Sequence, residues 1–190
     1  VGWDRISPAS DAIDLAEKAD AICFGTLAQR SRQSRETIQA ISSFAPKDAY
    51  RLLDINLRQR YYDKELIEES LYLANVLKVN DEEFNVLRDL FGLNGTEREV
   101  ALWFIEKYGL RMFVLTAGSS HSTIYTREEI STLPTPEVTV ADTVGAGDAF
   151  SGALIISLLK GQSLSEAHHF AVKTAAFVCT KEGAWPVYEE

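Results

Sequence analysis

Short apolar runs alternate with longer amphipathic runs along almost the whole chain, and few folds are compatible with this pattern. Buried strands that alternate with helices favour a mostly parallel sheet covered by helices. We therefore predict an α/β fold in which residues 1–190 form a single domain. The apolar runs of strand length are 21–26, 51–56, 76–79, 112–116 and 123–125, and a short alternating stretch follows at 138–140.

Helical spacing of apolar residues marks the segments between and after these strands. Thr96 with Glu99, and Ser163 with Glu166, match the capping box, in which two side chains satisfy backbone N–H groups at a helix start. The segment 145–160 is nearly all apolar, which predicts a buried helix. The expected helices are 11–18, 34–44, 63–75, 81–91, 96–109, 145–160 and 163–180.

The charge balance narrows the classes of partner. The 190 residues include 19 Lys and Arg against 28 Asp and Glu, a formal net charge of −9. A nucleic-acid binder usually carries a basic patch instead. No apolar run approaches the ~20 residues that span a membrane. We therefore expect neither nucleic acid nor a membrane as a partner.

The two cysteines, Cys23 and Cys179, each lie in an apolar stretch without a nearby His or Cys. This placement predicts buried thiols in a reducing compartment, and hence a cytoplasmic protein, rather than a disulfide or zinc framework. The chain starts at Val1 with neither an initiator Met nor a signal peptide. We therefore expect it to be a piece of something longer.

Polar side chains gather where the expected strands end, which is where ligands bind in open parallel sheets. The second strand leads into Asp54, Asn56 and Arg58, which period-2 alternation places on one face. Such a polar rim on an apolar sheet suits a charged, oxygen-rich ligand. The other polar or flexible positions at strand ends are Lys78, Asn80, Glu83, Thr116, Ala117 and Gly118.

Each of these features also has a plain structural interpretation. Asn80 and Glu83 could form only a helix N-cap with its reciprocal glutamate. Asp54 with Arg58 could be a surface ion pair that contributes little to stability. Lys78 could be a solvated strand residue, and the Thr-Ala-Gly segment could be only a turn.

The segment 142–152 is the strongest functional signal, because Gly145 and Gly147 flank an alanine directly before the long apolar helix. Glycine permits unusual backbone angles and close approach to a ligand. Successive N–H groups at a helix N-terminus form a nest that binds phosphate. Asp148 would repel an anion there, but it makes sense as a base that accepts a proton from an attacking hydroxyl. The alternative is a glycine-rich turn with Asp148 as a helix-cap carboxylate.

Other nucleotide and catalytic motifs do not occur in the sequence. There is no Walker P-loop pattern. Phe150 stands where the dinucleotide fingerprint requires its third glycine. A serine nucleophile elbow is missing as well, so the glycine-rich segment has to be interpreted on its own.

The segment 142–150, Asp-Thr-Val-Gly-Ala-Gly-Asp-Ala-Phe, resembles the C-terminal signature of the ribokinase-like (PfkB) carbohydrate kinases. Residues 80–83 resemble the Asn-x-x-Glu motif of that family. Residues 54–58 are similar to an Asp-x-Asn-x-Arg element of its fructokinase and ketodeoxygluconate kinase branches. Gly183-Ala184 resembles its closing Gly-Ala pair. The resemblance covers essentially the whole chain and is greatest to the fructokinase branch.

The resemblance implies a three-layer αβα sandwich, with its N-terminal part and lid missing, that phosphorylates a sugar hydroxyl with ATP. It makes Asp148 the catalytic base and gives Arg58 a contact with phosphate or substrate. Asn80 and Glu83 would position Mg²⁺ through water, and Asp142 would help to hold a monovalent cation such as K⁺. The transferring phosphoryl would bind the N–H groups of Gly145, Ala146 and Gly147, and the nucleotide site would be lined by Thr116, Ala117 and Gly118.

The sequence departs from the family pattern in two ways. His121 stands where members often have a second glycine in the nucleotide loop, and the sugar-binding front of the family is missing, so we expect a piece that is inactive alone. His168 and His169 are expected at surface or packing positions without a chemical role. Other interpretations stay open: a kinase for ketodeoxygluconate, ribose or a nucleoside, or a catalytically silent module for nucleotide binding or dimerisation. A homodimer is compatible with each.

Overall fold

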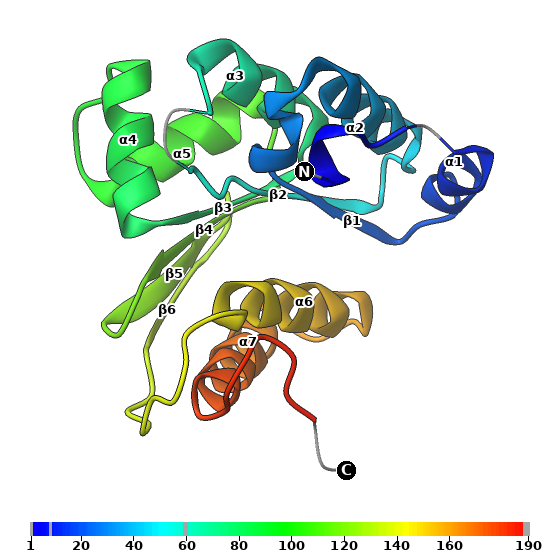
Figure 1. Ribbon diagram of the computed structural model, residues 1–190. Coiled ribbons are helices and arrows are strands. Elements are labelled where there is room, and N and C mark those ends of the chain that lie inside the picture. Colours follow the sequence, from blue (N-terminus) through cyan, green and yellow to red (C-terminus); the bar gives the residue numbers. More distant parts are fainter. Residues whose placement is uncertain (1, 8, 59–60, 188–190) are drawn as a thin grey trace. The chain divides into compact units, whose positions relative to one another are not determined.

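The computed structural model describes residues 2–7, 9–58 and 61–187 (Figure 1). Six strands form a sheet in the order β1-β2-β3-β4-β5-β6. The first four pair in parallel. The links from β4 to β5 and from β5 to β6 are too short for a parallel crossover, so these two pairs are antiparallel. With three parallel pairs, the sheet is mostly parallel. The strands are β1 (Ala21–Phe24), β2 (Tyr50–Asp54), β3 (Val76–Asn80), β4 (Met112–Ala117), β5 (His121–Tyr125) and β6 (Ile130–Pro134).

Helices follow the strands much as the hydrophobic spacing predicts. The α-helices are α1 (Ser10–Ala16), α2 (Arg32–Phe44), α3 (Lys64–Leu73), α4 (Asp81–Phe91), α5 (Glu97–Tyr108), α6 (Ala146–Leu159) and α7 (Leu164–Cys179), and two short 3₁₀ helices are η1 (Gly2–Asp4) and η2 (Leu27–Arg30). The chain forms two compact units. The first unit comprises Val1–Thr116 with Tyr125–Glu129, and the second comprises Ala117–Ile124 with Ile130–Glu190.

The first unit is a parallel sheet with α2 to α5 on one face (Figure 1). Strand residues such as Leu53, Leu77 and Phe113 point to these helices and join their apolar faces in one buried cluster. Because side chains alternate along a strand, the intervening residues point to the opposite face. Asp54 and Lys78 are two of these.

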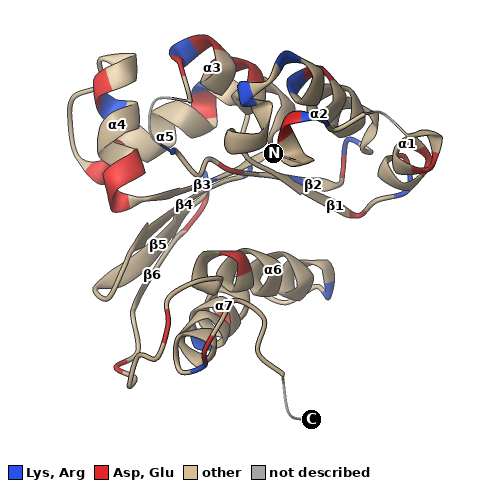
Figure 2. Cartoon of the chain, in the orientation of Figure 1, with Lys and Arg blue, Asp and Glu red and all other residues tan. Residues whose placement is uncertain are grey.

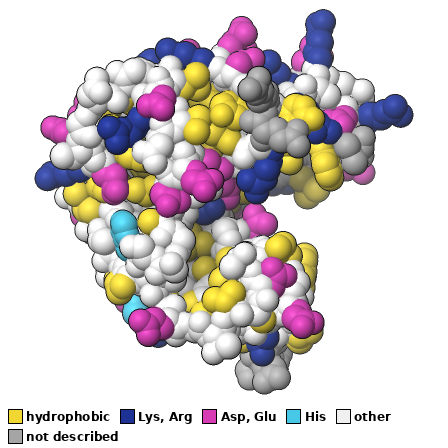
Figure 3. All heavy atoms as spheres, turned by 60° about the vertical axis from the view of Figure 1, so that its left-hand side comes forward, with side chains coloured by type: hydrophobic (Ala, Val, Ile, Leu, Met, Phe, Trp, Pro, Cys, Tyr) yellow, Lys and Arg dark blue, Asp and Glu magenta, His cyan; other side chains and the backbone are white. Residues whose placement is uncertain are grey.

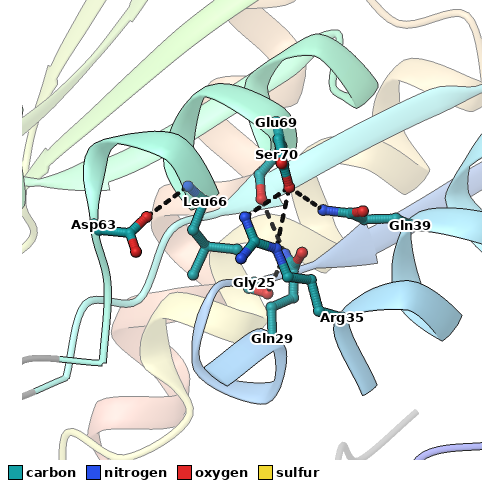
Figure 4. Close-up of polar contacts among 8 residues, drawn as sticks. All are labelled: Gly25, Gln29, Arg35, Gln39, Asp63, Leu66, Glu69 and Ser70. Atoms are coloured by element: carbon teal, nitrogen blue, oxygen red, sulfur yellow. Dashed lines mark hydrogen bonds and ion pairs between the residues drawn. The ribbon is translucent and has the colours of Figure 1, made fainter. Parts of the chain in front are cut away.

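Polar contacts join α3 to α2 and η2 (Figure 4). The Arg35 guanidinium and the Gln39 amide of α2 both donate to the Glu69 carboxylate, each at 2.7 Å. Gln29 of η2 donates to the Ser70 hydroxyl at 3.0 Å. At the start of α3, Asp63 caps the helix by accepting from the N–H of Leu66. These contacts fix the helices above β1 and β2.

The second unit consists of α6 and α7 packed together with the β5–β6 hairpin. His168 of α7 is buried between two hydroxyls: its Nε2 lies 2.8 Å from Ser122 Oγ and its Nδ1 lies 2.8 Å from Ser131 Oγ. Burial lowers the pKa of His168 to about 4, so the ring is neutral at pH 7. The expected packing position of His168 is confirmed, and His169 beside it is exposed.

The structure departs from the sequence-based interpretation at the stretch 138–140, at β6 and at the two cysteines. No strand forms at 138–140 in the described chain, and Val140 there is exposed. The sequence analysis did not predict the strand β6. Its residues alternate between half-buried and exposed positions, so the segment contains few of the apolar residues that mark a buried strand. Cys23 is exposed and Cys179 is only half-buried. Cys23 points away from the helical face, because its neighbour Phe24 belongs to the buried cluster.

The helix α6 is also less buried than its composition predicts. Its side chains Phe150, Leu154 and Ile155 are buried, whereas Ile156 and Leu159 are 46% and 42% exposed. On the face shown in Figure 3, hydrophobic side chains reach the surface among scattered charges of both signs. None of the helices within the described residues combines the length and hydrophobicity of a membrane span. The cytoplasmic location expected from the sequence stays a prediction.

Candidate functional site

The exit of β2 is held in an unusual conformation. Asn56 has a φ of +49°, a left-handed backbone that is uncommon outside glycine. The residues that follow β1 support the bend: Thr26 Oγ1 donates to the carbonyl of Ile55 at 2.6 Å, and a Cβ on Gly25 would lie 2.7 Å from the Asp54 carbonyl oxygen. The strand alternation therefore ends at Asp54. The prediction that residues 54, 56 and 58 share one face is wrong, because it assumed an extended backbone.

Asp54 forms an ion pair with Lys78 rather than with Arg58. Lys78 Nζ lies 2.7 Å from Asp54 Oδ2, and the two residues are register partners on β2 and β3. Lys78 is 5% exposed, so the interpretation of a solvated strand residue is wrong. Arg58 is exposed and donates to the carbonyl of its neighbour Leu57.

Asn80 and Glu83 form the helix cap that was one of the two interpretations left open. Asn80 Oδ1 accepts from the N–H of Glu83 at 2.8 Å, and Glu83 Oε2 accepts from the N–H of Asn80 at 3.0 Å. Glu83 Oε1 also accepts from the N–H of Leu57 at 2.9 Å, which ties the β2 exit to the start of α4. Burial raises the pKa of Glu83, while these two N–H bonds act in the opposite direction.

A pocket of about 160 Å³ brings three of the predicted site residues together: Arg58, Asn80 and Glu83. The first turn of α4 beside it is acidic (Figure 2). Glu83 can serve the helix cap and a ligand in the pocket at the same time, because each of its carboxylate oxygens can accept a second hydrogen bond. Sequence reasoning missed Leu57, Tyr62, Glu82 and Val86 in this wall, although Glu82 lies inside the Asn-x-x-Glu motif.

The end of β4 carries the predicted nucleotide loop. Thr116 is the register partner of Asn80, and its hydroxyl lies 3.4 Å from the carbonyl oxygen of Val79. In the second unit, Ala117 accepts a hydrogen bond from the N–H of Ser120. Gly118 has a φ of +50°, and its carbonyl accepts from the Thr135 hydroxyl at 2.8 Å. Thr116 and Ala117 therefore end β4, and Gly118 begins the turn that leads to β5.

The glycine-rich bend starts α6. Gly145 is the N-cap residue, with a φ of +83°. A Cβ at this position would lie 2.7 Å from the Ala184 carbonyl oxygen, so both the backbone angle and the neighbour require glycine. The N–H of Ala146 donates weakly, at 3.3 Å, to the carbonyl of Thr143. The first turn of a helix leaves N–H groups without intrahelical acceptors, and Gly147 lies in this turn, exposed.

Asp142 organises the backbone before the bend. Its Oδ1 accepts from the N–H of Val144 at 3.0 Å and its Oδ2 accepts from the N–H of Gly183 at 3.2 Å. These bonds, Val144 first, lower the pKa of the Asp142 carboxyl. The N–H groups of Ala141 and Asp142 both donate to the carbonyl of Cys179, so this loop is fixed to the end of α7.

Asp148 lies in the first turn of α6 and is exposed. Two residues later, Phe150 is buried with its ring edge-on to His168, at a centroid distance of 5.9 Å. The carboxylate and the aromatic ring therefore leave α6 on different sides, one toward solvent and one toward α7. Gly147 and Asp148 are exposed, whereas Gly145 is half-buried against Ala184.

The carboxylates suit hydrated cations rather than a preformed metal cage. Within residues 2–7, 9–58 and 61–187, no cluster of three His, Cys, Asp or Glu side chains could hold a metal ion. Mg²⁺ is often held by one or two carboxylates together with substrate phosphates and water. Glu83 fits that pattern through water, because backbone N–H groups already occupy one lone pair of each oxygen. Asp142 is ionised and fits a monovalent cation in the same way.

The family model of the pfkB family of carbohydrate kinases matches residues 4–189. The chain belongs to this family. An uncharacterized sugar kinase of Pyrococcus horikoshii is 31% identical over 180 residues, which cover 90% of this chain and 54% of that protein. Its crystal structure with ATP superposes with a TM-score of 0.74 over 90% of this chain and 55% of that one, at 28% identity.

Other relatives of this PfkB-family chain carry different substrate names. The fructokinase of Rhizobium leguminosarum bv. trifolii is 30% identical over 159 residues, covering 81% of this chain and 47% of that protein. Aminoimidazole riboside kinase of Salmonella enterica, solved with its riboside and an ATP analogue, is 28% identical at a TM-score of 0.69, covering 86% and 57%. The predicted ribokinase-like α/β fold class is confirmed. The chain spans about half the length of the curated relatives it matches.

Proposed function

We propose that the protein is an ATP-dependent sugar kinase that transfers the terminal phosphoryl group of MgATP to a sugar hydroxyl. The observation that carries this proposal is the bend at the start of α6. Gly145 adopts a left-handed backbone that only glycine suits there, and Asp148 is exposed in the turn that follows. A phosphate-binding helix start and a proton acceptor thus adjoin in one short segment.

The proposed reaction requires one proton acceptor and strong stabilisation of negative charge. The sugar hydroxyl oxygen forms a bond to the γ-phosphorus, the bond between that phosphorus and the β–γ bridging oxygen breaks, and ADP leaves. Asp148 accepts the hydroxyl proton. In phosphoryl transfer the transition state is loose, so a well-placed carboxylate is sufficient as the proton acceptor.

The N–H groups of the bend are the proposed site for the transferring phosphoryl. Gly145, Ala146 and Gly147 precede or begin α6, where the helix dipole and unpaired N–H groups favour an anion. The Ala146 N–H makes only a long bond to Thr143, which a phosphate oxygen can replace. Asp142 holds the loop in shape from the other side and would help to hold K⁺ beside it.

The nucleotide phosphates and their metal are assigned to the pocket of the first unit. Mg²⁺, when bound with ATP, neutralises phosphate charge. Asn80 and Glu83 would orient its water ligands from the start of α4, and Arg58 on the same wall would contact phosphate or sugar. We assign the base and ribose of ATP to the turn at Thr116, Ala117 and Gly118.

Fructose is the proposed acceptor, and a riboside is the alternative. The first rests on the relatives named fructokinase, and the second on the relative solved with aminoimidazole riboside. Calorimetric titration with ATP, followed by a coupled assay with ADP detection, tests the proposal across fructose, ribose, ketodeoxygluconate and nucleosides. We expect these 190 residues to bind ATP without turnover on their own, and to turn over one acceptor class once a sugar-binding front of the family is supplied. Absence of ATP binding would refute the proposal, whereas binding without turnover even with that front supplied would favour the silent nucleotide-binding module.

A further inference from the structure

We infer that Arg30 is a positioning residue for the pocket of the first unit, and that it acts by fixing the loop that carries Arg58. This inference rests on the proposed function and deepens it, because Arg58 is the pocket residue assigned above to phosphate or sugar. Arg30 is the last residue of η2, and its side chain is 21% exposed. It contacts two segments that are far apart in the sequence.

The first of these contacts is an ion pair with the N-terminal segment. Arg30 Nε lies 2.6 Å from Asp4 Oδ1, and Arg30 Nη2 lies 2.7 Å from Asp4 Oδ2. Two parallel bonds to one carboxylate fix the plane of the guanidinium as well as its position. The hydrogen bond with Arg30 lowers the pKa of Asp4 to about 2, so the carboxylate is ionised at pH 7. Because Asp4 offsets its charge, Arg30 is suited to positioning a neighbour rather than to binding an anion itself.

Asp4 is itself fixed to the start of α2. Its carbonyl accepts from the Ser31 hydroxyl at 2.7 Å. Two residues later, the N–H of Ile6 donates to the Ser34 hydroxyl at 3.0 Å, and the carbonyl of Ile6 accepts from the Thr37 hydroxyl at 3.0 Å. Ser34 and Thr37 are both buried. The N-terminal segment is thus docked on α2 by specific bonds, which hold the Asp4 carboxylate in place for Arg30.

The second contact of Arg30 is with an aromatic ring beside the pocket. Arg30 Cζ lies 4.7 Å from the centroid of the Tyr61 ring, within the range of a cation–π contact. Tyr61 is 44% exposed, so the core does not hold it. Its N–H donates to the carbonyl of Arg58 at 3.2 Å, and Tyr62 follows it in the pocket wall. Arg30 therefore holds this stretch, described at residues 57–58 and 61–62, which we call the pocket loop.

The Arg58 side chain depends on the backbone of the pocket loop for its position. Arg58 is exposed, and its guanidinium donates to the carbonyl of the adjacent Leu57 at 3.2 Å. It takes part in none of the ion pairs between described residues. A bond to the neighbouring residue does not orient a side chain toward the pocket, so Arg58 goes where the loop backbone places it.

The pocket loop is anchored at both ends. The N–H of Leu57 donates to Glu83 at its start, and Asp63 caps α3 just after its end. The contact from Arg30 lies between these two anchors. Because the anchors do not depend on that contact, its loss should let Arg58 move while both ends of the loop stay in place.

The test compares variants on both sides of the cation–π contact with matched controls. Arg30→Gln removes the charge, and Tyr61→Leu removes the ring. Tyr61→Phe keeps the ring as the conservative variant. Arg32→Gln is the control arginine, because Arg32 pairs with Glu36 on the surface of α2 and its side chain is 91% exposed.

Three measurements separate a positioning role from a merely structural one. Hydrogen exchange of the peptide that covers residues 55–63 measures how firmly the pocket loop is held, with the peptide of α5 as the internal reference. Calorimetry measures the affinity for MgATP, in the wild-type background and in the Arg58→Gln background. Urea unfolding midpoints show that each variant is folded, and Tyr61→Leu decides the test if Arg30→Gln does not fold.

We expect Arg30→Gln and Tyr61→Leu to speed exchange of the pocket loop by about fivefold and to weaken MgATP binding by about fivefold, with exchange of α5 unchanged. Neither should weaken MgATP binding further in the Arg58→Gln background, because Arg30 acts through Arg58. Tyr61→Phe and Arg32→Gln should match the wild type within about twofold.

Two results would overturn the inference and leave the proposed function standing. One is wild-type MgATP affinity in Arg30→Gln and Tyr61→Leu, whatever their exchange rates. The other is a loss of affinity that persists in the Arg58→Gln background, because Arg30 would then act on the ligand or on the whole fold. If the wild type itself fails to bind MgATP, the proposed function is refuted and the inference with it.

Discussion

Gly145 and Ala184 lie against each other although they are far apart in the sequence: a Cβ added to Gly145 would come within 2.7 Å of the Ala184 carbonyl oxygen. The same C-terminal segment donates the Gly183 N–H to the Asp142 carboxylate. The loop before α6 is therefore shaped by the end of the chain, not by its own residues alone. This contact and the positive φ together explain why residue 145 is a glycine.

Substituting Gly145→Ala should therefore destabilise the protein by at least about 1–3 kcal/mol, because alanine is strained at a φ of +83° and also meets Ala184. The free energy of unfolding in urea measures this loss. Gly152→Ala is the matched control in the same helix. A Cβ there meets nothing within 4 Å, and alanine should stabilise the helix by about 0.5–1 kcal/mol. Equal effects of the two substitutions would contradict the tight approach at Gly145.

Substituting Asp148→Asn should abolish proton acceptance while keeping the size and exposure of the side chain. If the protein is a sugar kinase, we expect turnover to fall by about 10²–10⁴-fold. The ATP dissociation constant should change by less than threefold. Rate assays with calorimetry of the same preparation give both numbers. An unchanged rate would exclude Asp148 as the base, and a matching loss of ATP affinity would assign it to binding instead.

The buried ring of His168 should make the protein sensitive to mild acid. Its pKa is lowered from 6.5 to about 4 by burial, so the unfolded chain binds the proton more readily than the folded one. The contribution of His168 to the free energy of unfolding is fully present above pH 6.5, where the ring is neutral in both states. It decreases as the pH falls toward 4, because the unfolded chain takes up the proton first. Between pH 7 and pH 5 the loss amounts to about 2 kcal/mol.

Urea unfolding of wild type and His168→Gln at both pH values checks this prediction. The difference between the two proteins should shrink by about 2 kcal/mol at pH 5. His169→Gln, on the exposed side of the same helix, should behave like the wild type. An acid response of His168→Gln identical to that of the wild type would show that other groups cause the loss.

Glu83 should stabilise the folded protein even in the absence of metal. Removing its carboxylate in Glu83→Ala leaves the N–H groups of Asn80 and Leu57 without their acceptor, which we expect to cost about 2 kcal/mol. Glu83→Gln keeps one acceptor oxygen and should lose roughly half as much. Unfolding in EDTA measures this structural part. If Glu83 also orients Mg²⁺, the Gln variant should lose more affinity for MgATP than for metal-free ATP.

The parts of the fold that follow local rules were predictable. Thr96 with Glu99 and Ser163 with Glu166 form the capping boxes that their spacing indicates, and α5 and α7 begin there. A cap requires only residues within one turn, so the sequence contains all the information. Asn80 with Glu83 obeys the same rule, which is why the cap was foreseen even though the pocket beside it was not fully described.

Positions that depend on neighbours distant in the sequence were not predictable. The pairing of Lys78 with Asp54 depends on the register of two parallel strands, which no local pattern specifies. The exposure of Cys23 depends on which strand lies at the edge of the sheet. The backbone of Asn56 breaks the alternation because contacts from Gly25 and Thr26 hold it there.

By itself, the amino-acid order determined the alternation of strands and helices, the helix caps and the glycine-rich start of α6, because each depends on residues within one turn or one strand. Only the tertiary structure decided that Ala184 closes against Gly145, that Arg58 meets Glu83 in one pocket, and that a lysine is buried beside Asp54. These contacts join segments that are remote in the chain. Their geometry is set by the packing of whole elements, which local propensities do not encode.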